Sequence, residues 1–254
     1  MFRRLFQRDS SVAQLRDTDA DWDRIARSDP YYGVLTDPRF RTENLTEEAL
    51  AEFFRSGEGA VKQAAKRLKS RHADFSPASA LDFGCGVGRL TRALAAMTGD
   101  AYGVDVAEAM LIEARRHAPA SAAFGHELPE RAFDWIMSLI VFQHIPPERG
   151  YRLLEALLQR LAPGGFVTLQ FALYREPEHS GAPGGRIVVD GGIVRTVNVP
   201  VPSSLRQGEM VMFDYDLTVI VAILAAADVS DLDLVHTNHG GFHGAFLYGR
   251  RASS

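Results

Sequence analysis

Three alternating glycines, Gly84, Gly86 and Gly88, form the part of this sequence best suited to hold a ligand. They follow a short apolar run, Ala80–Phe83, that is typical of a strand buried on both faces, and the apolar spacing becomes helical from Leu90. Glycine has no Cβ and accepts left-handed backbone angles, so the chain can turn sharply here and a ligand can approach the backbone. The pattern therefore predicts a strand, a binding turn and a helix.

Two acids accompany this turn. Asp82 lies inside the first strand, and Asp105 follows a second apolar stretch, Ala101–Val104. A carboxylate at that strand end can accept hydrogen bonds from both hydroxyls of a ribose, each worth roughly 1.5–3 kcal/mol. Arg89 occupies the position of the third glycine of the dinucleotide-binding pattern, and no Lys-Ser or Lys-Thr pair follows the turn. These features argue against a dinucleotide site and against a phosphate-binding loop.

Four blocks of the sequence together resemble the class I S-adenosylmethionine-dependent methyltransferases, and they come in the order that this family has. The resemblance implies that the cofactor is S-adenosyl-L-methionine and that the product is S-adenosyl-L-homocysteine. It also implies an α/β fold, a Rossmann-like seven-stranded sheet with its last strand antiparallel and helices on both faces. The blocks are the glycine turn with its strand and helix (80–94), the acid Asp105, the segment 133–145 and the segment 161–166.

The same resemblance implies which residues meet the cofactor. The turn Gly84–Gly88 would face its methionine part, and Asp105 would hold its ribose. The family often has a Gly-Asp pair whose acid meets the adenine amino group. Here Gly125 is followed by His126 and Glu127, and the choice between these two stays open. The predicted cofactor residues are Asp82, Gly84, Cys85, Gly86, Gly88, Asp105, Val106, His126, Glu127, Ser138 and Gln143.

Three residues are candidates for the base that takes a proton from the methyl acceptor. Histidine titrates near neutral pH, and His144 follows the fourth strand, where the resemblance implies the substrate side of the pocket. His239, with His243 nearby on a glycine loop, comes second, and Tyr174 comes third. Alternatively, the first histidine only orders its loop or contacts the cofactor. No metal site is predicted, because His236, His239 and His243 have no acidic or cysteine partner close by in the sequence.

The composition limits the partners and the surroundings that we expect. A chain of 254 residues with 46% hydrophobic content can bury the core of one domain. The net charge of −4 argues against nucleic acid, whose binding is dominated by basic surfaces. The single cysteine, Cys85, cannot form an internal disulfide, which fits a reducing cytoplasm. No apolar run approaches the ~20 residues of a membrane span, so we expect a cytoplasmic protein with no such span.

Two additions to the core are expected. Residues 1–45 would form an N-terminal helical cap segment, and residues 46–254 the methyltransferase domain. In the cap, Tyr31 or Tyr32 would line the cofactor pocket, or these aromatic residues only fasten the segment to the core. Residues 174–213, after strand 5, are rich in glycine and proline and carry a β-hairpin pattern. We interpret them as a substrate lid, or as an arm that packs on a second copy and forms a homodimer.

Several helices are also predicted. Thr46 would cap a first helix, and Gly57 and Gly59 would interrupt the apolar pattern before a second, basic helix with a solvated face. The stretch 217–227, capped by Asp214 or Asp216, is apolar on most faces and is expected to be buried.

These observations predict a methyltransferase that moves a methyl group to an oxygen or nitrogen of a small polar molecule. A carbohydrate or a specialised metabolite is favoured as the acceptor, and the transfer would be an in-line displacement with a histidine base. The alternatives are a non-catalytic S-adenosylmethionine-binding partner subunit and a protein or nucleic-acid methyltransferase. A nicotinamide-dependent oxidoreductase is disfavoured by Arg89.

Overall fold

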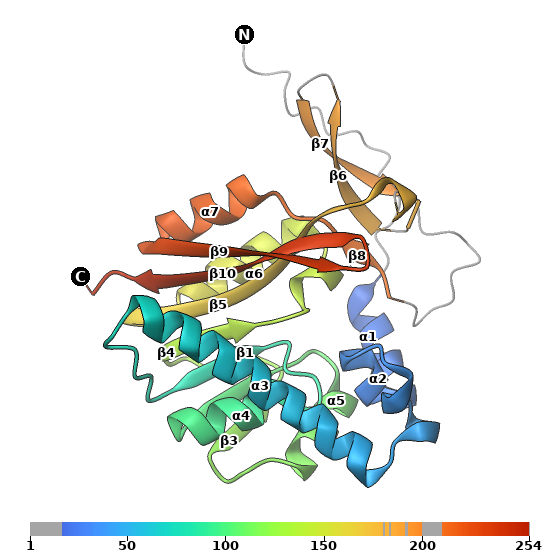
Figure 1. Ribbon diagram of the computed structural model, residues 1–254, viewed down its shortest axis with the longest axis vertical. Helices are drawn as coiled ribbons and strands as arrows, with labels where there is room; N and C mark the ends of the chain where they lie inside the picture. Colours follow the sequence, from blue (N-terminus) through green and yellow to red (C-terminus); the bar gives the residue numbers. More distant parts are fainter. Residues whose placement is uncertain (1–16, 180, 183, 191–192, 200–209, 254) are drawn as a thin grey trace.

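Seven strands form the central sheet of the protein, in a computed structural model that describes residues 17–179, 181–182, 184–190, 193–199 and 210–253. The strand order is β3-β2-β1-β4-β5-β10-β9 (Figure 1). The first five strands run parallel, whereas β10 is antiparallel to both of its neighbours. The predicted sheet with an antiparallel last strand is therefore confirmed. The bounds are β1 Ala80–Phe83, β2 Ala101–Val104, β3 Ala122–Gly125, β4 Phe133–Ser138, β5 Leu161–Arg175, β9 Val229–His239 and β10 Phe242–Arg251.

Helices cover both faces of this sheet because successive strand residues point to opposite sides. In β4, Trp135 is buried against α3 and α4, whereas its neighbour Ile136 is buried against α6 and α7. Figure 1 shows α3 and α4 in front of the sheet, with α6 and α7 behind it. The helices are α3 (Glu47–Arg71), α4 (Arg89–Thr98), α6 (Pro147–Leu158) and α7 (Leu217–Ala226).

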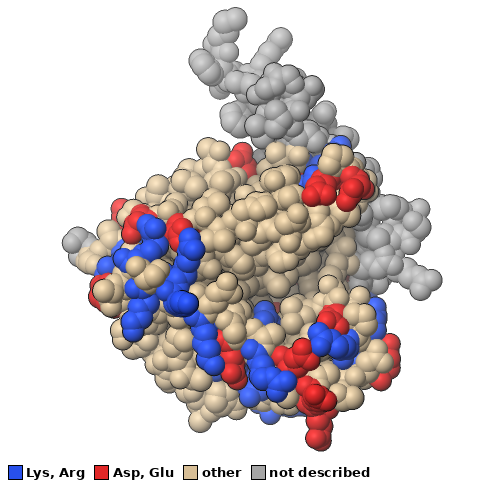
Figure 2. All heavy atoms as spheres, in the orientation of Figure 1, with Lys and Arg blue, Asp and Glu red and all other residues tan. Residues whose placement is uncertain are grey.

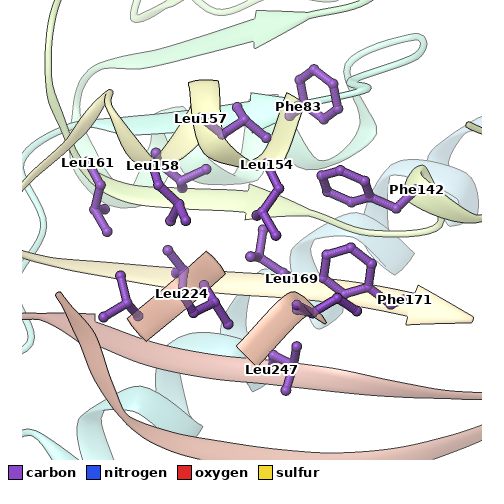
Figure 3. Close-up of a cluster of buried hydrophobic side chains, with 14 of the residues drawn as sticks. Phe83, Phe142, Leu154, Leu157, Leu158, Leu161, Leu169, Phe171, Leu224 and Leu247 are labelled. Atoms are coloured by element: carbon purple, nitrogen blue, oxygen red, sulfur yellow. The ribbon is translucent and has the colours of Figure 1, made fainter. Parts of the chain in front are cut away.

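The larger apolar core reaches the carboxyl ends of the central strands (Figure 3). Phe142, on the short helix η3 (Phe142–His144), stacks on Phe171 of β5 with ring centroids 4.6 Å apart. The ring of Phe83, the last residue of β1, lies 5.6 Å from the Phe142 ring, centroid to centroid. This aromatic contact fixes the loop after β4, because Phe142 is fully buried and lies two residues before His144.

The N-terminal segment folds onto α3 and α5. Tyr31 is buried, with its ring edge-to-face against Phe53 and its hydroxyl 3.1 Å from His117 Nε2. Tyr32 lies under the Arg41 guanidinium, at 3.8 Å from the ring centroid. These aromatic residues fasten the segment to the core, and neither of them lines the cavity that opens beside Gly84 and Gly86. The segment comprises α1 (Thr18–Ser28), α2 (Pro30–Val34), η1 (Pro38–Phe40) and η2 (Thr42–Asn44), and α5 spans Glu108–Arg116.

The insertion after β5 contains the predicted hairpin. Strands β6 and β7 pair antiparallel, from Gly184 with Val199 to Asp190 with Ile193, and β8 pairs with β6 in parallel. The hairpin stands away from the main sheet (Figure 1). Its turn at 191–192 and the stretch 200–209 lie outside the described residues, and its role as a lid or as an arm stays a prediction. The bounds are η4 Pro177–His179, β6 Gly184–Asp190, β7 Ile193–Val199 and β8 Met212–Phe213.

Two helices differ from the sequence-based expectation. The interruption expected at Gly57 and Gly59 is wrong, because α3 is continuous over 25 residues, with the Thr46 hydroxyl accepting the Ala49 N–H as its cap. Gly57 is instead the point where α3 crosses α4 at close range. The expected burial of α7 on most faces is also wrong, since only Ile220 and Leu224 are buried there. Asp216 caps α7 by accepting the Thr218 N–H at 2.8 Å.

Basic side chains follow α3 along one face of the molecule (Figure 2). Two of them pair with acids of β9, Arg67 with Asp233 and Arg71 with Asp231. The predicted solvated helix face is thus present, with part of its charge neutralised by the neighbouring strand. Among the described helices, none combines the length and the apolar character that a membrane crossing needs.

Gly57→Ala is expected to destabilise the protein even though alanine is the better helix former. A Cβ at this position would lie 2.2 Å from the Arg89 carbonyl oxygen, which belongs to the backbone and cannot rotate away. Overpacking typically costs ~1–3 kcal/mol, more than the ~0.5–1 kcal/mol gained in helix propensity. Gly59→Ala is the matched control, because nothing lies within 4 Å of its Cβ, and it should be stabilising. Urea unfolding measures both changes, and shifts of the same sign would contradict this account.

Candidate active site

The turn between β1 and α4 is built from left-handed glycines. The φ angles of Gly84, Gly86 and Gly88 are 73°, 53° and 79°, a region that other residues rarely adopt. A Cβ on Gly84 would lie 2.4 Å from Val141 Cγ2, and one on Gly86 would lie 2.6 Å from Val34 Cγ2. The absence of these atoms therefore lets two other segments, the loop after β4 and the end of α2, close against the turn.

Asp105 is tied to this turn through the backbone. Its Oδ2 accepts the Gly86 N–H and its Oδ1 accepts the Ala107 N–H, both at 2.9 Å. Burial raises the pKa of this carboxyl, and the two backbone hydrogen bonds oppose that rise. A carboxylate offers about four acceptor positions, so each oxygen keeps capacity for one more hydrogen bond.

Four of the predicted cofactor residues lie within the turn or behind it and do not line the adjacent cavity. Asp82 accepts the Thr91 hydroxyl at 2.6 Å through Oδ2, and its Oδ1 has no partner among the described residues. Burial raises the pKa of this carboxyl to about 6. Ser138 donates to the Phe83 carbonyl at 3.0 Å. These buried groups support the shape of the turn. The four residues are Asp82, Cys85, Gly88 and Ser138.

A cavity of about 360 Å³ opens beside the turn. Six of the predicted cofactor residues line it. His126 is held between the Asp105 carbonyl oxygen (3.0 Å from Nδ1) and Glu108 (2.6 Å from Nε2), whereas the Glu127 carboxylate forms no hydrogen bond with the described residues. Glu127 is thus the group next to β3 that stays available to a ligand. The six residues are Gly84, Gly86, Asp105, Val106, His126 and Glu127.

Part of this cavity wall comes from residues that the sequence reasoning missed. Trp22 and Asp19 of α1 line it, and Asp19 accepts two hydrogen bonds from Arg149 of α6, each 2.7 Å long. Arg89 also lines it, and its guanidinium is buried, which lowers its pKa. Its Nε has no hydrogen-bond partner in the part of the chain that the structure describes. No local pattern in the sequence brings α1 and α6 together, because their contact depends on the tertiary fold.

A second cavity of about 490 Å³ adjoins the first. Four residues line both cavities and so form their common wall: Gly33, Val34, Ile140 and His144. Ile140 has a φ of 63°, and its N–H donates to Gln170 Oε1 at 3.1 Å. The predicted residue Gln143 lines this second cavity and not the first.

His144 is buried in the common wall. Its Nδ1 lies 3.2 Å from the Val211 carbonyl oxygen, and since a carbonyl only accepts, Nδ1 must carry the hydrogen. The Nε2 lone pair then faces the Gln143 amide, 3.3 Å away, and the ring meets Trp22 edge-to-face. Burial lowers the pKa of the imidazole to about 4, so it is neutral near pH 7.

The other two candidate bases lie differently. His239 lines the second cavity, and its Nε2 is 3.1 Å from Gln170 Nε2. Tyr174 lines neither cavity; it is 48% exposed and stacks on His243, whose Nε2 is 2.9 Å from Glu176 Oε1. Within the described part of the chain, no three His, Cys, Asp or Glu side chains are arranged to hold a metal ion.

Comparison with known proteins agrees with this geometry. Residues 80–165 match the family described as "Methyltransferase domain". This match covers about a third of the chain and includes the glycine turn after β1, Asp105 and β4. Its fold is similar to that of magnesium protoporphyrin IX methyltransferase from Synechocystis with bound S-adenosyl-L-homocysteine, with a TM-score of 0.61 and 18% identity over 93% of this chain and 100% of that one.

Two further methyltransferases are similar. The N-methyltransferase NodS from Bradyrhizobium japonicum, in complex with S-adenosyl-L-homocysteine, has a TM-score of 0.58 and 16% identity over 92% of this chain and 98% of that one. Trans-aconitate 2-methyltransferase from Methylobacterium radiotolerans is 39% identical over 111 residues, which are 41% of this chain and 42% of that relative. The match thus spans less than half of that relative. The cofactor of the family is S-adenosyl-L-methionine.

The burial of His144 predicts a pH dependence of stability. Its folded pKa of about 4 lies below the ordinary 6.5, so the unfolded chain binds a proton in this window and the folded protein does not. The contribution of the neutral imidazole to the free energy of unfolding is complete above pH 6.5. It is lost as the pH falls toward 4, and the loss is up to about 3 kcal/mol. Urea unfolding of the wild type and of His144→Gln between pH 4 and pH 7 measures the difference. A difference that does not change with pH would contradict the neutral, buried imidazole.

Proposed function

We propose that the protein transfers a methyl group from S-adenosyl-L-methionine to an oxygen or nitrogen of a small molecule. The observation that carries this proposal is the pair of adjoining cavities with a common wall. Gly84, Gly86 and Asp105 line one cavity, and the other cavity provides a separate site for an acceptor. A bound cofactor and a bound acceptor would then meet at His144 and Ile140.

The residues of the first cavity suit this cofactor. Asp105 keeps acceptor capacity for two ribose hydroxyls, and Glu127 is available to accept the adenine amino group. The buried Arg89 guanidinium, with its unpaired Nε, suits the carboxylate of the methionine part. Apolar side chains such as Val106 and Met110 complete the lining.

Methyl transfer depends more on the alignment of the acceptor atom with the methyl group than on acid–base catalysis. S-adenosyl-L-methionine supplies, when bound, a methyl group on a sulfonium that is already activated for displacement. The chain has to hold the acceptor atom in line and keep water out. Alignment of this kind can supply roughly 7–11 kcal/mol, whereas a positioned base contributes typically ~10²–10⁴-fold in rate.

His144 is the residue we propose to orient the nucleophile. With hydrogen on Nδ1, its Nε2 lone pair can accept a hydrogen bond from an acceptor O–H or N–H, which would replace the Gln143 amide that now faces it. Its low pKa makes it a weak base, so this role is orientation first and proton removal second. The imidazole also remains neutral, which avoids a positive charge next to a sulfonium cation.

The acceptor belongs to the small molecules, with a carbohydrate or specialised metabolite as the proposed class. The partial match to trans-aconitate 2-methyltransferase makes trans-aconitate a candidate to be tested directly. The test of the function as a whole is transfer of label from methyl-labelled S-adenosyl-L-methionine to the small molecules of a cell extract. Labelled product with the wild type and none with Asp105→Asn supports it. Tight cofactor binding without any labelled product would favour a non-catalytic role.

Asp105→Asn is expected to weaken S-adenosyl-L-homocysteine binding by at least about 100-fold. The change replaces charge-assisted hydrogen bonds of roughly 1.5–3 kcal/mol each by weaker ones. Asp100→Asn is the matched control, because this acid precedes β2 where Asp105 follows it, and it pairs with Arg131 away from the cavity. Calorimetry measures both affinities. Unchanged binding by Asp105→Asn would remove the ribose role.

His144→Ala is expected to keep its affinity for S-adenosyl-L-homocysteine within about threefold and to lose turnover by roughly 10²-fold, with residual activity left by alignment. His239→Ala, which alters the far side of the second cavity, should raise KM more than it lowers kcat. Steady-state kinetics with the acceptor identified by label transfer measures both. Full activity of His144→Ala would remove its role.

A further inference from the structure

The two cavities differ in charge. The first contains acids and bases, among them Asp105, Glu127, Arg89 and Arg149. Among the described residues that line the second cavity there is no aspartate, glutamate, lysine or arginine. Its two histidines are His144, which burial keeps neutral, and His239. Within the described part of the chain, the second cavity therefore has no fixed charge with which to pair a charged ligand.

Arg175, a cation close to the second cavity, is already neutralised. Its guanidinium lies 5.5 Å from the Phe242 ring centroid and donates to the Met212 carbonyl at 3.2 Å, and both of these residues line the cavity. The side chain is 1% exposed, pairs with Asp214 at 3.1 Å, and donates to the Gly185 carbonyl at 2.9 Å. Using this arginine to bind an anion would break a buried ion pair, which is strongly unfavourable.

The polar groups that remain in the cavity are neutral. Gln170 accepts the Ile140 N–H, so its amide nitrogen donates to His239 Nε2 at 3.1 Å, which leaves the histidine hydrogen on Nδ1. The Thr237 hydroxyl oxygen is buried and has no hydrogen-bond partner among the described residues. A buried hydroxyl without a partner costs free energy that a ligand hydroxyl, amine or carbonyl group would recover.

Apart from the neutral polar residues Gln143 and Thr36, the rest of the lining is apolar. Its aliphatic, thioether and aromatic side chains suit the apolar body of a ligand, and so favour a specialised metabolite over a fully hydroxylated carbohydrate. The volume of about 490 Å³ lies within the range of small-molecule sites. These side chains are Leu35, Phe171, Met210, Met212 and Phe242.

From this lining we infer that the methyl acceptor is an uncharged molecule with a substantial apolar body and a hydroxyl or amino nucleophile, and that carboxylates are poor ligands. The inference rests on the proposed function, because it takes the second cavity as the acceptor site. A carboxylate that enters the cavity gives up its water and meets no cation, whereas the matching neutral ester finds Thr237, Gln170 and the apolar walls.

The test compares matched pairs of small ligands. Calorimetry first measures S-adenosyl-L-homocysteine binding, and the loaded protein is then titrated with methyl para-hydroxybenzoate and with para-hydroxybenzoate, with methyl para-aminobenzoate and with para-aminobenzoate, and with trans-aconitate. We expect each ester to bind at least about tenfold tighter than its carboxylate, and trans-aconitate to bind no better than the carboxylates. Equal or tighter binding of the carboxylates, or no binding of any ester at millimolar concentration, overturns the inference.

A positive charge placed at the cavity edge should weaken the preference for esters. Thr36 is exposed at the cavity edge, and Thr36→Arg should lower the ester-to-carboxylate preference by at least about fivefold, whereas Thr36→Gln, long but uncharged, should keep it. An unchanged preference in Thr36→Arg would locate the binding elsewhere and overturn the inference. If the wild type does not bind S-adenosyl-L-homocysteine, the proposed function itself is refuted. If the protein binds it but then prefers carboxylates, only the inferred acceptor class is refuted.

Discussion

The hydrogen bond from the Gly86 N–H to the Asp105 carboxylate joins two turns on which the site depends. Parallel pairing of β1 with β2, with Phe83 opposite Val104, brings both turns to the same edge of the sheet. Each turn fixes the other, because the carboxylate is held by backbone that is itself held in the left-handed region by glycine. The first cavity is a consequence of that arrangement, since its floor is this joined pair of turns.

The second cavity depends on a different contact. The stacked rings of Phe142 and Phe171 hold η3 against β5, so that His144 stays buried at the boundary between the two cavities. Burial has an energetic cost here, because it lowers the pKa of the imidazole and raises that of the Asp82 carboxyl. Both groups lie at or directly behind the site, and strongly perturbed pKa values of this kind cluster at functional sites.

The sequence contained the strand, turn and helix of the first cavity because those signals are local. Glycine spacing, a strand-end acid and an apolar run are read within a few residues, and they predicted Gly84, Gly86 and Asp105 at the cavity. The contributions of Trp22 and Arg149 could not be read in this way, since α1 and α6 are far apart in the sequence. Tyr174 was the third candidate base, but it lies near the end of β5 and stacks on His243 at the surface.

Helix patterns failed where packing overrode propensity. Gly57 suggested an interruption, yet the glycine is needed because the Arg89 carbonyl approaches to where a Cβ would be. The apolar residues of α7 suggested full burial, yet Val219 and Val221 remain partly exposed. In both helices the outcome depends on how closely a neighbouring element packs against the helix. The spacing of apolar residues along one sequence does not contain that distance.

Ile140, which contributes to the common wall of the two cavities, has an unfavourable backbone conformation. A β-branched side chain with a φ of 63° is unfavourable by roughly 1–3 kcal/mol, and the surrounding contacts must compensate for it. Glycine here would relax the backbone and increase the stability of the fold, but it would also remove a side chain from the common wall of the two cavities. Stability and a well-defined wall between the cavities therefore place opposite demands on residue 140. Selection for heat tolerance alone would tend to replace this isoleucine and so to weaken the wall.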